Sequence, residues 1–419
     1  MLNILCILGF LEWSGQALAE TPSKNNDATE SVQISDSVSG HRVKSIDVTD
    51  GQVKLVQYED EKIGQYPKRI QDGARWLHTS LDFVWSCWEV MHSLYLRDYK
   101  KLQDVVAEVK KKYPDSGVAP VGRALMWQVL MLENVDFKYE MQYKNSFDVA
   151  KADLEQAMLI EGNDAWETFL MGAILGVDAI HELRKEDFLD AINRGYEAIG
   201  FIEQAKSMAP FFVDSQLGDG LWLYWQSLIA SNVPGIPGFP DDRAKGIALM
   251  ETAERESVFL RPAATHALTY TWIEEGKMKS ALALATHLQD AYPDNVINLQ
   301  VLGRVQMYNR MYDAAEGSFN RVLLISPKNE RVHYYLARLY MDKRSYTQAE
   351  EQMNTYLKFD LSDYHKGYAY YYQGHIYARQ KRFADAKKSY DLAWKTNKVK
   401  GADTKSQQMS EKLNKKKDK

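Results

Sequence analysis

The hydrophobic pattern of this chain is that of a series of amphipathic helices. From residue 68 to about residue 397, apolar side chains recur at three- and four-residue spacing, in segments that end at Gly, Pro, Asn or Asp. Alternation with a period of two residues, which would indicate strands, is nearly absent from this region. The pattern therefore predicts an all-α protein whose first helix starts after Pro67.

A small residue repeats along the C-terminal half at a nearly constant spacing. Thr269, Gly303, Ala337 and Gly374 are 34, 34 and 37 residues apart, and a second small residue follows each of them 12 positions later. Two antiparallel helices can approach closely only where small side chains face each other, so each set predicts one helix pair. One pair cannot bury its apolar face alone, whereas a stack of pairs can.

These segments resemble the tetratricopeptide repeat family, in which a helix pair carries small residues in both helices and a proline shortly after the second helix. Pro293 and Pro327 occupy the proline position, while Leu361 and Lys398 replace it in the last two repeats. The resemblance implies an α-solenoid of about eight antiparallel helix pairs that form a right-handed superhelix.

The chain divides into five parts. Regular repeats occupy residues 262–397, and residues 66–261 form less regular repeats with longer helices. Residues 20–65 are polar and predict a mostly disordered leader, with a strand near Val53 to Val56. Residues 398–419 are rich in Lys and predict a basic, disordered tail. Residues 1–19 predict a signal peptide.

The export signal is a short apolar run from Leu2 to Leu11, followed by Ala17-Leu18-Ala19. Small residues separated by one position are typical of a signal-peptidase site, so we expect cleavage after Ala19. No Lys or Arg precedes the apolar run, which departs from the usual signal. The expected location is periplasmic or outer-membrane-associated in a bacterium. No segment is long enough to predict a transmembrane helix, and membrane association stays open.

Residues 75–395 are also similar to a bacterial group of exported tetratricopeptide proteins, which is distantly similar to the eukaryotic inclusion-body clearance protein family. The similarity includes Asp164-Ala165-Trp166, Gly218-Asp219-Gly220 and Tyr292-Pro293-Asp294. It implies an architecture and no activity. We interpret Gly218-Asp219-Gly220 as a turn that leads into a helix, since no phosphate-binding loop follows it.

Charge and motif content argue against several classes of function. The formal net charge is -5, so the chain lacks the basic surface expected of a nucleic-acid-binding protein. The nine His show no metal-binding spacing, and no acid-base pair or nucleophile motif is found. The sequence therefore predicts a protein that is not an enzyme and that carries no metal or cofactor.

The resemblance also implies a partner-binding groove, lined by the first helix of each pair. Its residues, carried over by position, are Arg304, Tyr308, Tyr334, Arg338, Tyr368, Tyr371, His375 and Arg379. Tyr and Arg are enriched at binding hot spots. A second candidate contact is Phe239, in the loop from Val233 to Pro240, which is either a ligand-contacting loop or a stiff connector.

Two functions remain open at this point. The first is a scaffold or adaptor of the bacterial cell envelope that binds a protein or peptide partner through the groove. The second is the binding of a lipid or another apolar ligand in the N-terminal half, where aromatic residues are dense. The sequence predicts neither the partner nor the oligomeric state.

Overall fold

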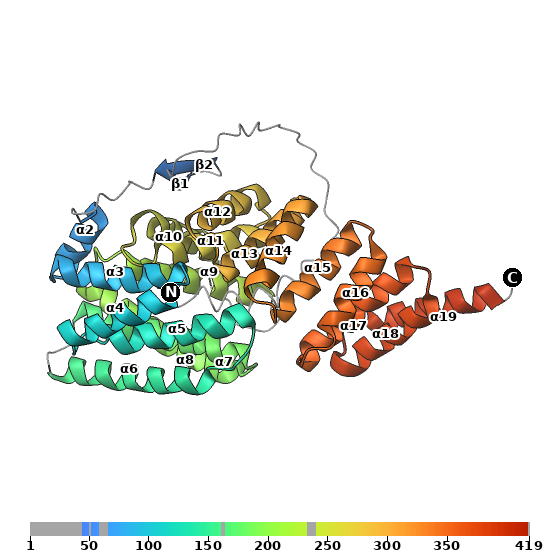
Figure 1. Ribbon diagram of the computed structural model, residues 1–419, viewed down its shortest axis with the longest axis horizontal. Coiled ribbons are helices and arrows are strands. Elements are labelled where there is room, and N and C mark those ends of the chain that lie inside the picture. The colour runs from blue at the N-terminus through green and yellow to red at the C-terminus, as the bar shows by residue number, and fades with distance from the viewer. Residues whose placement is uncertain (1–43, 50–51, 58–65, 161–163, 233–239, 418–419) are drawn as a thin grey trace. The chain divides into compact units, whose positions relative to one another are not determined.

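The computed structural model describes residues 44–49, 52–57, 66–160, 164–232 and 240–417 (Figure 1). Strands β1 (Lys44–Thr49) and β2 (Gln52–Gln57) pair antiparallel, with Lys44 opposite Gln57. The strand predicted near Val53 to Val56 therefore exists, and it has a partner that the sequence did not predict. Every other element of the described residues is a helix, so the all-α prediction is confirmed outside this hairpin.

The helices follow one another along the chain from α2 to α19. They are α2 (Lys68–Trp76), α3 (Leu81–Tyr95), α4 (Tyr99–Lys112), α5 (Val118–Asn134), α6 (Glu140–Ile160), α7 (Ala165–Arg184), α8 (Phe188–Met208), α9 (Asp214–Asn232), α10 (Arg243–Glu256), α11 (Arg261–Glu274), α12 (Met278–Ala291), α13 (Val296–Tyr308), α14 (Tyr312–Ile325), α15 (Glu330–Asp342), α16 (Tyr346–Tyr356), α17 (Asp363–Arg379), α18 (Phe383–Asn397) and α19 (Ala402–Lys417).

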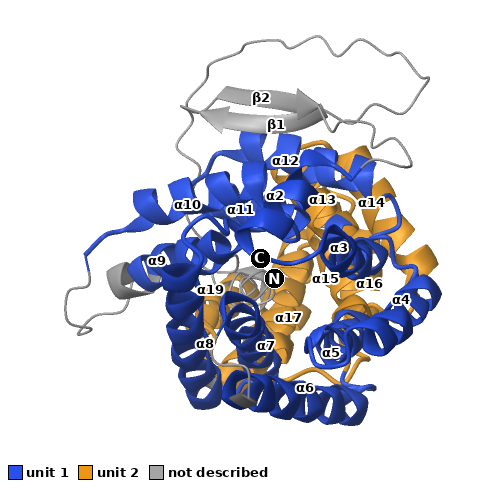
Figure 2. Ribbon diagram, turned by 90° about the vertical axis from the view of Figure 1, so that its left-hand side faces the viewer, with its two compact units in different colours: residues 1–131, 137–298 blue, residues 132–136, 299–419 orange. Residues whose placement is uncertain are grey.

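The chain forms two compact units, coloured separately in Figure 2. Unit 1 comprises residues 1–131 and 137–298, and unit 2 comprises residues 132–136 and 299–419. Within unit 1, α3 packs on α4, α7 on α8, α9 on α10 and α11 on α12. Within unit 2, α15 packs on α16 and α17 on α18. The pairs α11–α12, α15–α16 and α17–α18 are those that the repeated small residues predict.

A glycine in the first helix packs against an aromatic ring in the second helix of two pairs in unit 2. A Cβ atom on Gly303 would lie 2.6 Å from the ring of Phe319, and one on Gly374 would lie 2.7 Å from the ring of Tyr390. The ring is 16 residues after the glycine in both pairs, and both rings are buried. The atoms nearest to a Cβ built on Gly303 thus belong to Phe319, whereas the sequence predicts that Gly303 packs against Ala315.

Two glycines bring α9 and α10 of unit 1 into backbone contact. A Cβ on Gly220 would lie 2.7 Å from the carbonyl oxygen of Gly246, and one on Gly246 would lie 2.5 Å from that of Gly220. The interpretation of Gly218-Asp219-Gly220 as a turn is therefore wrong, because all three residues lie within α9. Glycine is present here because a side chain would separate the two helices.

The turns between paired helices contain one residue in the left-handed conformation. Gly276, Arg310, Arg344 and Lys381 have φ values of 70°, 60°, 60° and 62°. Their spacings of 34, 34 and 37 residues equal those of the small-residue anchors. The next amide closes the turn in each case, as when Ser345 N–H donates to the carbonyl oxygen of Tyr340. This hydrogen bond is the Schellman closure of a helix end.

The predicted disordered tail is wrong for residues 402–417, which form helix α19. Ala402, Ser406 and Met409 lie on one face of this helix and are buried. Val399 and these apolar residues belong to the same core as Tyr390. The lysines obscured a three- and four-residue apolar spacing, which is the spacing that buries one helix face. Lys398, at φ 48°, ends α18 where the family has proline.

Replacing Gly303 by Ala tests the close contact inside the α13–α14 pair. The added carbon meets the Phe319 ring, so we expect the free energy of unfolding to fall by about 1–3 kcal/mol. Gly317→Ala is the matched control, because Gly317 is exposed in α14 and nothing lies within 4 Å of its Cβ position. Helix propensity predicts that the control gains up to about 1 kcal/mol. Chemical unfolding that finds equal effects would contradict the packing argument.

Five histidines predict that the protein loses stability in mild acid. Burial is the main cause that lowers the pKa of His92, His181, His287, His365 and His375 to about 4. Between pH 6.5 and 4 the unfolded chain thus binds more protons than the folded protein, so the free energy of unfolding falls as the pH falls through this window.

His181 provides the sharpest version of this test. Its side chain is fully buried, and Nδ1 lies 3.2 Å from Oε1 of Gln128. We expect His181→Gln to reduce the loss of stability between pH 7 and pH 4.5 by at most about 3 kcal/mol, since glutamine does not titrate. His78→Asn, at an exposed position with φ 49°, is the control. An unchanged pH slope for His181→Gln would disprove the assignment.

Candidate binding site in the C-terminal repeats

The eight residues of the predicted groove lie on the first helices of three pairs in unit 2. Arg304 and Tyr308 lie on α13, Tyr334 and Arg338 on α15, and Tyr368, Tyr371, His375 and Arg379 on α17. Their exposure differs widely. Arg304, Tyr334 and Tyr371 are buried, with 3%, 4% and 7% of their surface exposed. Tyr308, Arg338, Tyr368 and His375 are half-buried, and Arg379 is exposed.

Arg338 lies among tyrosine rings. Its guanidinium carbon is 5.8 Å from the ring centroid of Tyr334 and 5.2 Å from that of Tyr372. The two rings meet edge to face, with centroids 5.7 Å apart. Tyr308 and Tyr335 are also among the electrostatic neighbours of Arg338. The faces of aromatic rings attract a cation, and this attraction strengthens where water is excluded. We call Arg338, Tyr308, Tyr334 and Tyr372 the arginine–tyrosine cluster.

No acidic side chain of the described residues forms an ion pair with the positive charge of this cluster. Among the described residues, none forms a hydrogen bond or an ion pair with Arg338. Asp342, one turn further along α15, is exposed and interacts with Arg338 only from beyond ion-pair distance. The hydroxyl of Tyr334 is buried without a hydrogen-bond partner. The cluster thus combines a half-buried cation, aromatic surface and an unmet polar group.

Tyr371 and His375 pack against a ring on another helix, α18. Their rings are 4.7 Å apart, and both contact the ring of Tyr390 on α18, at 5.7 and 5.5 Å. Burial, followed by the charges of Lys405 and Arg379, lowers the pKa of His375 to about 4. His375 is therefore neutral near pH 7. Tyr371 belongs to the core beneath α18 and α19, where it stabilises the end of the unit.

Arg304 and Tyr368, two further residues of the predicted groove, lie outside the cluster. Arg304 is buried, with its guanidinium carbon 5.3 Å from the ring of Tyr335, which stacks on Phe319. It is part of the packing inside the repeats. Tyr368 lies 5.0 Å from the ring of Tyr364 on the same helix. The structure therefore brings together Tyr308, Tyr334 and Arg338 of the predicted set.

Sequence reasoning missed Tyr372. The carried-over positions select Tyr371, which is buried, and pass over the next residue, which completes the cluster. The run Tyr370-Tyr371-Tyr372 is the only signal that the sequence offers. Aromatic residues at three successive helix positions must face different directions, and the repeat pattern does not say which of them meets Arg338.

Two further predicted sites lie outside the described residues. These are Phe239 in the proline-rich loop and Ala19 at the predicted cleavage site.

Three carboxylates approach one another in the described part of unit 1, namely those of Glu182, Asp187 and Asp190. Glu182 lies 3.0 Å from the ammonium group of Lys185, and Asp187 accepts a hydrogen bond from the Asp190 amide at the start of α8. The ion pair with Lys185 explains the position of the Glu182 carboxylate, and helix capping explains that of Asp187. None of the described helices is long and apolar enough to cross a bilayer.

Comparisons with known proteins agree on the type of fold. Residues 306–370 match the family model of the tetratricopeptide repeat. No curated protein sequence matches the chain significantly. One chain of the APC/C hetero-tetramer Cut9-Hcn1 matches the structure with a TM-score of 0.51 and 14% identity, over 74% of this chain and 52% of that chain. This protein thus spans about half the length of that neighbour.

Two other solved structures show weaker likeness. Yeast Tom70 matches with a TM-score of 0.39 and 13% identity, over 77% of this chain and 80% of that chain. A human IFIT1 dimer with PPP-AAAA matches with a TM-score of 0.43 and 15% identity, over 84% of this chain and 87% of that chain.

The matched segment contains α15, α16 and the arginine–tyrosine cluster except Tyr372, and it repeats with the period found above. The first neighbour supports the same helical-repeat architecture along most of the chain. Residues 306–370 therefore match the tetratricopeptide repeat, and the described helices form a helical-repeat fold of the tetratricopeptide type.

Proposed function

We propose that this protein is a non-catalytic scaffold that binds an acidic segment of a protein or peptide partner through the arginine–tyrosine cluster of unit 2. The tetratricopeptide fold suggests protein interaction in general. The observation that carries the finer proposal is that Arg338 lies against two tyrosine rings and has no ion pair with any described residue. A carboxylate of the partner would supply the missing charge.

Physical chemistry favours this occupant over a neutral one. A guanidinium group binds a carboxylate through two parallel hydrogen bonds, which are stronger than hydrogen bonds between neutral groups. Half-buried Tyr308 and Tyr372 add aromatic surface that keeps water away from such a pair. Arg304, Tyr334 and Tyr371 are buried and support the helices, so the contact with the partner falls to half-buried Arg338, Tyr308 and Tyr372.

The cellular setting is a separate part of the proposal. We propose that the protein acts in the bacterial cell envelope, as an exported protein. The support is the apolar run from Leu2 to Leu11 and the Ala17-Leu18-Ala19 sequence.

The first prediction concerns Arg338. Peptides rich in Asp and Glu, with one aromatic residue, should bind the full chain more tightly than matched peptides that carry Asn and Gln. Arg338→Gln should weaken binding of the acidic peptides 10- to 100-fold, which corresponds to about 1.4–2.8 kcal/mol, and should leave the amide peptides unchanged. Fluorescence anisotropy with labelled peptides measures both affinities.

The controls separate charge from folding. Arg338→Lys keeps the charge but loses the planar pair of donors, so an intermediate affinity is expected. Arg123→Gln removes an exposed arginine from unit 1 and should have no effect. The melting temperature of Arg338→Gln should fall only slightly, because the variant loses the two cation–π contacts and no hydrogen bond. Equal binding of acidic and amide peptides would disprove the proposal.

The second prediction concerns export. In the native bacterium, mass spectrometry of the protein from the envelope fraction should find Glu20 as the first residue. A protein that begins at Met1 and stays with the cytoplasmic fraction would overturn the envelope assignment. It would leave the peptide-binding proposal intact, since the two rest on different residues.

A further inference from the structure

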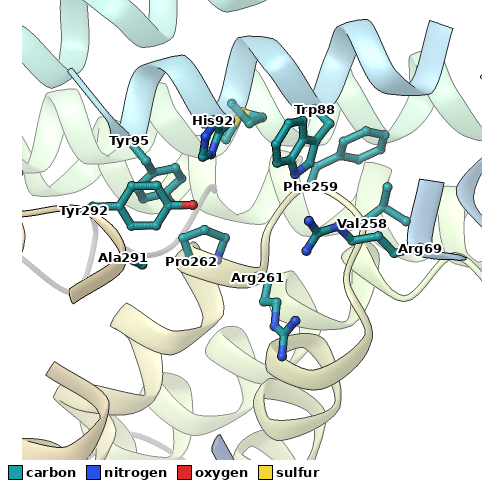
Figure 3. Close-up of a pocket in the computed structure, with 11 residues that line it drawn as sticks. Arg69, Trp88, His92, Tyr95, Val258, Phe259, Arg261, Pro262, Ala291 and Tyr292 are labelled. Carbon is teal, nitrogen blue, oxygen red and sulfur yellow. The ribbon is translucent and has the colours of Figure 1, made fainter. Parts of the chain in front are cut away.

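Unit 1 contains a cavity of about 190 Å³ between α3, the start of α11 and the end of α12 (Figure 3). The side chains of Trp88, His92 and Tyr95 reach into it from α3, and Tyr292 and Pro262 face them. Its full lining is Arg69, Trp88, Met91, His92, Tyr95, Val258, Phe259, Arg261, Pro262, Ala291 and Tyr292. The cavity lies wholly within one unit and is unrelated to the arginine–tyrosine cluster.

The charged residues of this lining are both arginines. Arg69 lies beneath Trp88, with its guanidinium carbon 5.4 Å from the ring, and Arg261 lies at the edge of the group (Figure 3). Within the part of the chain that the structure describes, no Asp or Glu lines the cavity. Two cations that line a partly open, largely apolar cavity favour an anionic ligand, because the attraction between charges increases where water is partly excluded.

His92 adds a polar group that is neutral near pH 7. Burial, followed by the charges of Lys101 and Arg69, lowers its pKa to about 4. The ring stacks on Trp88, with centroids 4.5 Å apart, and its Nδ1 atom is buried without a hydrogen-bond partner. A neutral imidazole contributes one hydrogen bond to a ligand and adds no third positive charge.

The volume restricts the size of the ligand. An engineered cavity of about 150 Å³ holds one benzene molecule, so about 190 Å³ holds one ring or a short alkyl chain. A second cavity of about 50 Å³ shares Met91 and Phe259 with the first. Its other lining residues include Cys87, Leu125 and Phe169, and its surface is almost entirely apolar. An apolar tail that passes Met91 and Phe259 would thus enter a matching environment.

A buried carboxylate holds the segment between the two cavities. Asp214, at the start of α9, accepts hydrogen bonds from the amides of Val258 and Phe259 at 2.8 Å and from that of Leu260 at 2.9 Å. Its side chain is fully buried. These bonds satisfy the amides of the segment that leads into α11 and hold the backbone of Phe259 in place. The cavity is therefore preorganised by the fold.

We propose that this cavity binds a small monocarboxylate with an apolar body, such as a short- or medium-chain fatty acid. The carboxylate pairs with Arg69 and lies near Arg261, His92 donates or accepts one hydrogen bond, and the chain packs against Trp88 and Phe259. The apolar end extends toward the second cavity. This assignment gives the N-terminal half a ligand of defined chemistry, and it stands independently of the peptide-binding proposal.

Isothermal titration calorimetry of the full chain tests the ligand class. The probes are butyrate, hexanoate, octanoate and decanoate, each compared with the primary alcohol of equal length. We expect saturable binding of one carboxylate per chain, with affinity that rises with length and then levels off. The alcohols should bind at least tenfold more weakly. The absence of saturable binding, or equal affinities of acid and alcohol, would overturn the proposal.

Variants test the two parts of the site separately. Arg69→Gln should weaken carboxylate binding at least tenfold and leave alcohol binding unchanged, while Arg123→Gln, at an exposed position on α5, should change neither. Ala173 lines the second cavity, so Ala173→Val should reduce the affinity for decanoate and preserve that for butyrate. If Arg69→Gln does not fold, the acid and alcohol series on the unmodified protein still decides the question. Equal loss for all chain lengths in Ala173→Val would contradict the direction of the tail.

Discussion

The close approach of paired helices is the constraint on which the rest of this structure depends. Gly303 against Phe319 and Gly374 against Tyr390 place one ring on the backbone of the neighbouring helix, and Gly220 against Gly246 places backbone on backbone. A pair that packs so closely still has an apolar face left over, and only the next pair can bury it. The left-handed turn residues recur with the same period, because each pair must be closed in the same way.

Both candidate sites use the same physical device in different surroundings. Arg338 lies among the tyrosines of unit 2, and Arg69 lies beneath Trp88 in unit 1. Aromatic faces attract a cation but carry no negative charge of their own, so both arrangements suit the binding of an anion. The accessible surface differs. Arg338 is half-buried among first-helix side chains, which suits a segment of another chain, whereas Arg69 faces a cavity that holds only a small molecule.

The sequence predicted the helix pairs of the C-terminal half well, because the burial of one face imposes a period that can be read from residue types. Other features had weaker signals. Asp50-Gly51, a common hairpin sequence, separates the runs that form β1 and β2, but short strands next to polar residues gave little pattern. Arg310 and Arg344 adopt a conformation that usually selects glycine, so the turns were not marked by their residue type. Helix α19 was hidden because lysines dominate its composition.

The candidate sites were harder to predict, for a reason that follows from the repeat itself. A period assigns each residue to a face of its helix, and it therefore found Arg338 and Tyr334, yet it does not determine which side chains each residue meets. Tyr371 shares its repeat position with Tyr334 and both are buried, but Tyr334 contacts Arg338, whereas Tyr371 packs in the core with residues of α18 and α19. The residues that line the cavity in unit 1 recur with no sequence period. Arg69 and Tyr292 meet there although they are more than two hundred residues apart in the sequence. Asp214 fixes the intervening segment by accepting hydrogen bonds from backbone amides, and such bonds cannot be predicted from the types of the residues that donate them. A repeat protein thus reveals its scaffold in its sequence, while its binding sites arise where the repeats depart from one another.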